Sequence, residues 1–157
     1  MAKVIIVFDS KTGNTESMAE ALAEGASEVG RVEVELKKLG TPFPMKALAE
    51  ADAVILGSPA RYAHITSEMR DFIWAAKNLN TQGRLNLNGK VGGAFGSYGW
   101  DGGRSLQTIK AELASLGVEV LGEVIAVDRM GAMGVRIDDA DLEKCRQLGK
   151  RIAERIV

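Results

Sequence analysis

The stretch from residue 9 to residue 15, Asp-Ser-Lys-Thr-Gly-Asn-Thr, constrains the fold more than any other part of the chain. It follows a short apolar run at residues 4–8, whose β-branched side chains are typical of a strand buried on both faces. After it, apolar residues recur at helical spacing from Met18 to Val29, so we expect a helix to begin at about Thr15. The stretch is therefore predicted to be a strand-to-helix turn. The free N–H groups of such a helix start favour an anion.

The side chains of this turn suit a phosphate in particular. Ser10, Thr12 and Thr15 offer hydroxyl groups, and Gly13 permits a tight turn. The turn has neither the G-x-x-x-x-G-K-[ST] pattern of nucleotide-hydrolysing proteins nor the G-x-G-x-x-G pattern of dinucleotide-binding folds. The alternative interpretation is a helix start that uses Ser and Thr only as caps.

The pattern [ST]-x-T-G-x-T after a first strand resembles the phosphate loop of the flavodoxin family. In that family the loop binds the terminal monophosphate of FMN with hydroxyls and amides, and it needs no cationic side chain. The resemblance implies FMN as the cofactor.

The rest of the chain alternates predicted strands and helices, without a repeat or a linker. Apolar runs at residues 53–56 and 91–95 indicate two further buried strands, whereas residues 32–36 and 118–121 alternate like strands at the edges of a sheet. Alternating strands and helices favour a parallel sheet with helices on both faces. We therefore predict an α/β fold over residues 1–157: a single flavodoxin-like domain, a three-layer sandwich whose five parallel strands have the order 2-1-3-4-5. Glycines 92 and 93 would let a helix pack close to the sheet.

In this strand order a ligand binds beyond the carboxyl ends of the strands, where the order reverses. The loops there are residues 10–15, 58–64 and 96–103. The second loop has the pattern G-[ST]-P-x-R-[FY], which is similar to the quinone-reducing, tryptophan-repressor-binding-protein branch of the flavodoxin superfamily. That branch commonly has Gly-Asn where this chain has Ala63 and His64. The resemblance implies that Arg61 or Tyr62 lies against the flavin ring, and we expect no chemical role for His64.

The third loop, F-G-S-Y-G-W-x-G-G, sets two aromatic residues among glycines. The glycines give the aromatic rings little to pack against, so Tyr98 and Trp100 are interpreted as a stacking platform rather than as core. The motif resembles the flavodoxin domain of flavodiiron proteins (A-type flavoproteins). There the loop holds the pyrimidine edge of FMN and stacks an aromatic residue on the ring. The residues expected to bind the cofactor are Ser10, Lys11, Thr12, Gly13, Asn14, Thr15, Ser58, Pro59, Ala60, Arg61, Tyr62, Ala63, Ser97, Tyr98, Gly99, Trp100 and Gly102.

Composition limits the function classes. The chain has a net charge of −1, from 20 Lys and Arg against 21 Asp and Glu, so nothing indicates a nucleic-acid or membrane partner. It has one histidine, which excludes a di-iron site built from several histidines within these residues. The only cysteine, Cys145, lies at helical spacing with apolar residues and is predicted to be part of the core rather than a reactive thiol. With no signal-peptide pattern and no apolar run long enough to span a bilayer, we expect a cytoplasmic protein.

The resemblance implies a short-chain flavodoxin: an electron carrier that binds FMN non-covalently and passes electrons between redox protein partners, rather than an enzyme with its own substrate. The donor and the acceptor are not indicated by the sequence. An alternative is an FMN-dependent NAD(P)H:quinone oxidoreductase of the tryptophan-repressor-binding-protein type. A third class, a phosphorylated receiver module, would need an Asp at the end of the third strand, where this chain has Ser58.

Overall fold

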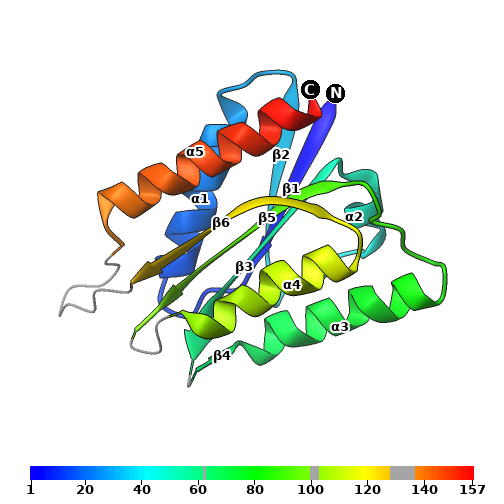
Figure 1. Ribbon diagram of the computed structural model, residues 1–157, viewed down its shortest axis with the longest axis horizontal. Coiled ribbons are helices and arrows are strands. Elements are labelled where there is room, and N and C mark those ends of the chain that lie inside the picture. The colour runs from blue at the N-terminus through cyan, green and yellow to red at the C-terminus, as the bar shows by residue number, and fades with distance from the viewer. Residues whose placement is uncertain (62, 100–102, 128–136) are drawn as a thin grey trace.

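Five parallel strands form the centre of the molecule (Figure 1). The computed structural model describes residues 1–61, 63–99, 103–127 and 137–157, with Arg61 described by its backbone alone. The strands are β1 (Ala2–Phe8), β2 (Val32–Lys38), β3 (Ala53–Arg61), β5 (Val91–Tyr98) and β6 (Glu119–Val127), and their order in the sheet is β2-β1-β3-β5-β6. The predicted order and fold class are confirmed, with one addition. The short strand β4 (His64–Ile65) pairs antiparallel with the end of β3.

Helices cover both faces of the sheet. Helices α1 (Asn14–Ser27) and α5 (Asp139–Ile156) lie side by side on one face, and α3 (Ser67–Thr81) and α4 (Gln107–Ser115) lie on the other (Figure 1). The short helix α2 (Lys46–Glu50) packs on the second face, and a 3-10 turn, η1 (Arg104–Leu106), leads into α4. Within the ranges given above, no helix is long and apolar enough to cross a membrane.

Alternation along the central strands divides the core into two parts. On β1, Val4 and Ile6 face α1 and α5, whereas Ile5 and Val7 face α3 and α4. All four are fully buried, as the continuous apolar run predicts. The edge strand β2 instead alternates exposed and partly buried residues, which confirms its predicted edge position.

The central strands run further than their apolar runs suggest. β3 continues to Arg61 and β5 to Tyr98, because Ser58 pairs with Gly96 and Pro59 with Ser97 in the parallel register. The hydrogen bonds between the two strands are made by backbone groups, so the pairing continues after the side chains become polar. Helix α1 begins at Asn14, one residue earlier than expected.

Two glycines let α1 and α5 approach at backbone level. A Cβ atom on Gly149 of α5 would overlap the carbonyl of Leu22, and one on Gly25 of α1 would overlap the carbonyl of Arg146. The expectation of close helix packing is confirmed for Gly93, because a Cβ atom there would lie 2.9 Å from Cδ1 of Ile152 on α5. At Gly92 a Cβ atom would instead meet the carbonyl of Val54 on β3. Cys145 is buried in the same layer, as predicted, and burial raises the pKa of its thiol to about 12.

Candidate functional site

The turn after β1 is organised by the hydroxyl of Ser10. Its Oγ accepts hydrogen bonds from the N–H groups of Gly13 (3.1 Å) and Glu16 (3.3 Å), both at the start of α1. This leaves the O–H of Ser10 to serve as a donor. Gly13 has φ of 96°, a left-handed conformation that favours glycine, and it is the N-cap of α1. The turn is thus closed by its own side chains and presents the amino end of a helix.

Two further hydroxyls of this turn take different positions. Thr12 is exposed, and its Oγ1 accepts a hydrogen bond of 3.2 Å from the side-chain amide of Asn14. Thr15 is buried, and its Oγ1 lies 3.1 Å from Oγ of Ser97, at the end of β5. The first and third predicted loops are therefore joined directly by a pair of buried hydroxyls.

Lys11 connects the turn to helix α3. Its ammonium group forms an ion pair with Glu68, in the first turn of α3, and lies 3.5 Å from Oδ2 of Asp9. The Lys11 and Ser67 hydrogen bonds lower the pKa of the Glu68 carboxyl to about 2. Since Lys11 is held by two carboxylates, an anion at this turn would be bound by N–H and O–H groups rather than by a free cation.

The end of β3 is fixed to helix α3 by Ser58. Ser58 is fully buried, and its Oγ donates to the carbonyl of Pro59 (2.9 Å) and accepts from the N–H of Thr66 (3.1 Å). Thr66 in turn caps α3 by accepting a hydrogen bond from the N–H of Met69. The hydroxyl of Ser58 thus fixes the start of α3.

The second predicted loop is largely a hairpin. Ala60 pairs with Ile65 and Arg61 with His64, which leaves two positions between the paired strands. Ala63, the second of these, has φ of 64°, a conformation that costs a non-glycine residue about 1–2 kcal/mol. His64 is exposed on β4, as expected of a solvated histidine. The sequence did not predict β4, because two residues are too few for an alternating pattern.

In the third loop, the structure corrects the interpretation of Tyr98. Tyr98 is partly buried against the core layer beside α4, and a Cβ atom on Gly103 would lie 2.9 Å from its ring. The ring therefore packs partly on the core, because the backbone of Gly103 supplies the contact that was thought to be missing. Gly99 lies at the exposed end of the loop. Tyr62, Trp100 and Gly102, also predicted to contact the cofactor, lie outside the described residues, as does the side chain of Arg61.

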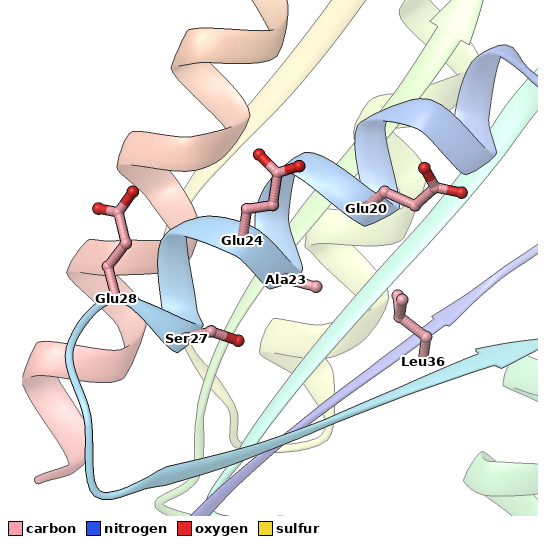
Figure 2. A pocket seen from close by; sticks show the side chains of 6 residues that line it. All are labelled: Glu20, Ala23, Glu24, Ser27, Glu28 and Leu36. Carbon is pink, nitrogen blue, oxygen red and sulfur yellow. The ribbon is translucent and has the colours of Figure 1, made fainter.

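A shallow hollow of about 610 Å³ lies elsewhere, between α1 and the edge strand β2 (Figure 2). Leu36 points from β2 toward Ala23 on α1, and three glutamates of α1 and its end, Glu20, Glu24 and Glu28, are also among the lining residues. The Glu24 carboxylate lies 3.6 Å from the guanidinium of Arg146 on α5. The described residues that line the hollow include carboxylates and no cation, so it does not suit a phosphate-bearing ligand. Among the described residues, no group of three or more His, Cys, Asp or Glu could hold a metal ion.

The comparisons with known proteins agree with this geometry. The family model described as flavodoxin matches residues 6–149. A flavodoxin of Aquifex aeolicus (strain VF5) is 33% identical over 166 residues, covering 98% of this chain and 86% of that protein. The chain belongs to the flavodoxin family. It is an FMN-binding electron carrier of the flavodoxin type, consistent with a site that offers helix-end N–H groups and hydroxyls.

Further matches place this flavodoxin-family chain among redox proteins. An NAD(P)H dehydrogenase (quinone) of Archaeoglobus fulgidus is 32% identical, covering 98% of this chain and 97% of that protein. A solved flavodoxin from the domain Archaea is 30% identical, with a TM-score of 0.77 and 98% of each chain covered. The flavodiiron protein from Giardia intestinalis is 25% identical with a TM-score of 0.79, covering 98% of this chain but 36% of that protein. The likeness to flavodiiron proteins is therefore to one part of them.

Three residues of the site were not predicted from the sequence. Asp9 is buried beside the turn, and its Oδ1 accepts the N–H of Ser10 at 2.9 Å. Glu68 and Thr66 are described above as partners of Lys11 and Ser58. Asp9 carries no signal of its burial, since aspartate is mostly exposed in proteins. Glu68 and Thr66 carry none, because only the tertiary structure brings α3 beside the turn.

Proposed function

We propose that this chain holds the phosphate of FMN at the turn of residues 10–15. The support is the arrangement of donors: the amino end of α1 follows Gly13, and the hydroxyls of Ser10 and Thr12 lie in the same turn. A helix start binds an anion through its N–H groups and its dipole. Lys11 contributes its backbone, since its side chain is held by Glu68 and Asp9.

The ring of FMN then lies between the second and third loops, beyond the ends of β3 and β5. The parallel register brings Pro59 beside Ser97, so these two loops start at the same edge of the sheet. The hairpin with Ala60 and Ala63 forms one side, and the segment from Ser97 to Gly99 forms the other. The sequence assigns the ring contacts to Arg61, Tyr62, Tyr98 and Trp100, and these stay predictions, as does the contact of Gly102 with the cofactor.

When bound, FMN supplies one- and two-electron chemistry, and the protein supplies binding, orientation and electrostatics. The buried pair of Thr15 and Ser97 fixes the first and third loops relative to each other. The hydrogen bond between Ser58 and Thr66 fixes the end of β3 relative to α3. This chain's residues therefore act by holding the cofactor rather than by proton transfer to a substrate. The carrier passes electrons between redox proteins, and we infer that it does so in the cytoplasm.

A quinone reductase is the second candidate, favoured by the A. fulgidus match and by the G-[ST]-P-x-R-[FY] pattern. Steady-state turnover of NADH with benzoquinone separates the two. We expect the FMN-loaded protein to turn over these substrates no faster than free FMN does, whereas saturable turnover above that rate would favour the reductase.

The phosphate site is tested by comparing the binding of FMN and riboflavin to the apoprotein. Because the turn offers several donors to one phosphate, FMN is expected to bind far more tightly than riboflavin. The substitution Thr12→Ala should weaken FMN binding by roughly 1.5–3 kcal/mol, the range for a hydrogen bond to a charged group, and leave riboflavin binding unchanged. Thr81→Ala, which removes an exposed hydroxyl in the last turn of α3, is the matched control. Equal affinity for FMN and riboflavin would exclude this phosphate site.

A further inference from the structure

A groove runs along the α3 and α4 face of the molecule from the β3–β4 hairpin. One cavity of about 420 Å³ begins at Ala63 and His64 and is lined from the other side by η1 and α4. A second, of about 250 Å³, continues between α3 and α4. Thr108 lines both cavities, so they are neighbours on this face. We call this surface the α3–α4 groove; its larger side chains are Ile65, Arg70, Trp74, Lys77, Arg104 and Glu112.

The most unusual side chain of the groove is Trp74. It is 64% exposed, and it shares one face of α3 with Arg70, four residues earlier, and Lys77, three residues later. Scattered exposed apolar residues are common, but tryptophan and arginine together in a hollow are typical of residues that dominate protein–protein binding. In protein–protein complexes, such residues are enriched in the part of the interface that the partner covers.

The charge of the groove differs from that of the chain. Among the described residues that line it, three are cations, Arg70, Lys77 and Arg104, and one is a carboxylate, Glu112. Lys77 is neutralised by Glu112, with Nζ 2.7 Å from the carboxylate. Arg70 has only a weak pair, 3.7 Å from Asp71 with both side chains largely exposed, and Arg104 forms no ion pair in the part of the chain that the structure describes. Two guanidinium groups are therefore available to a partner.

The opposite charge lies on the other face. Glu20, Glu24 and Glu28 line the hollow between α1 and β2 (Figure 2), and Glu24 is paired with Arg146 of α5 at 3.6 Å. The net charge of −1, from 20 Lys and Arg against 21 Asp and Glu over the whole chain, therefore does not describe either region by itself. Complementary potentials decide which partner docks and on which surface.

We propose that the α3–α4 groove docks an acidic protein partner. Carboxylates of that partner meet Arg70 and Arg104, and an apolar group covers Trp74. This inference rests on the proposed function, because the groove begins at the hairpin that forms one side of the proposed flavin site. A partner seated there lies next to the cofactor, as an electron carrier requires.

The test uses the oxidised, FMN-loaded protein and two oxidised probes, so that no electron passes. A plant-type [2Fe–2S] ferredoxin serves as the acidic probe and cytochrome c as the basic one. Binding is measured by calorimetry at low ionic strength. It is located by the indole N–H resonance of Trp74, which the variant Trp74→Phe assigns. We expect the ferredoxin to bind, to shift the Trp74 resonance, and to lose affinity as salt is added.

Variants then separate the contribution of the arginine charges to binding from that of contact with Trp74. The double variant Arg70→Glu, Arg104→Glu and the single variant Trp74→Ala should each weaken ferredoxin binding at least tenfold. All three residues are substantially exposed, so folding and FMN content should be unchanged. The control is Glu20→Lys, Glu28→Lys in the hollow between α1 and β2, which changes the net charge by the same number of units with the opposite sign and should leave the Trp74 shift in place.

Each other outcome has a definite meaning. A protein that binds no FMN contradicts the proposed function rather than the docking surface. With FMN bound, the proposal is overturned if the ferredoxin does not bind, if cytochrome c shifts Trp74 instead, or if the arginine variants bind the ferredoxin as before. It is also overturned if NADPH shifts Trp74 while the ferredoxin does not, since the groove would then be a nucleotide site.

Discussion

The two helical layers of this molecule are built in opposite ways. On one face, α1 and α5 approach until the backbone of each meets a glycine of the other, at Gly25 and Gly149. On the other face, α3 and α4 leave a groove between them, with a mostly exposed Trp74 in it and an ion pair between Lys77 and Glu112 across it. The same strands support both layers, since alternate residues of β1 and β3 face each side.

The difference shows how one sheet combines a closed layer with an open one. The close approach of α1 and α5 depends on the lack of a side chain at Gly25 and Gly149, because a Cβ atom at either position would push the helices apart. The α3–α4 layer keeps large side chains at its rim and leaves space beside the proposed cofactor site. We expect substitutions in the first layer to change stability, and substitutions in the second to change recognition.

The largest expected effect concerns Cys145, in the closed layer. Burial first, and the nearby Asp141 second, raise the pKa of its thiol from the usual 9.0 to about 12, and Arg146 opposes them only weakly. Because only the thiolate reacts, at pH 8 the folded protein should react with a thiol reagent about a thousandfold more slowly than the unfolded chain. Reaction with a chromogenic disulfide, with and without denaturant, measures this. Equal rates in both conditions would mean that the α1–α5 layer opens readily.

The next effect is on stability, through the substitution Gly149→Ala. The new Cβ would overlap the carbonyl of Leu22, so the helices must shift. We expect the free energy of unfolding to fall by about 3 kcal/mol, despite the better helix propensity of alanine. Denaturant unfolding measures it. Thr108→Ala, at an exposed position of the α3–α4 groove, is the control and should change stability by less than about 0.5 kcal/mol. A smaller loss for Gly149→Ala than for Thr108→Ala would contradict the comparison.

A smaller effect of opposite sign is expected for Ala63→Gly, at the hairpin where the groove begins. Glycine adopts the φ of 64° without strain but has greater freedom in the unfolded chain, so the net gain should be about 0.5–1 kcal/mol. Thermal unfolding measures the change. Ala60→Gly, at a paired position of β3, offers the matched control and should instead destabilise by roughly 0.5–1 kcal/mol. Destabilisation by both substitutions would show that the strain at Ala63 is negligible.

The smallest effect belongs to the ion pair between Lys77 and Glu112. Lys77 is about half exposed, so screening limits the contribution of the pair, and a double-mutant cycle with Lys77→Met and Glu112→Gln should give a coupling energy below about 1 kcal/mol. Added salt should reduce it further. A coupling energy above that of an exposed pair would mean that the α3–α4 layer is closed as firmly as the α1–α5 layer.

Much of this protein follows from local patterns in its sequence. The continuous apolar runs identified the three central strands, and the alternating runs identified β2 and β6 as edges, because a residue's burial follows directly from its place in the pleat. The strand order followed from those two classes. The turn after β1 was predicted because hydroxyls and a glycine between a strand and a helix have a local geometry that needs no distant partner.

Other features were decided only by the tertiary structure. Tyr98 packs on Gly103 and on the core, and Lys11 is held by Glu68 from a helix 57 residues away in sequence. The closeness of α1 and α5 depends on Gly25 and Gly149, each of which looks in the sequence like an ordinary weak point of a helix. Likewise, no pattern in the sequence predicts the groove between α3 and α4. Such features depend on which surfaces meet, and hydrophobic periodicity specifies which face of an element is buried but not what lies against it.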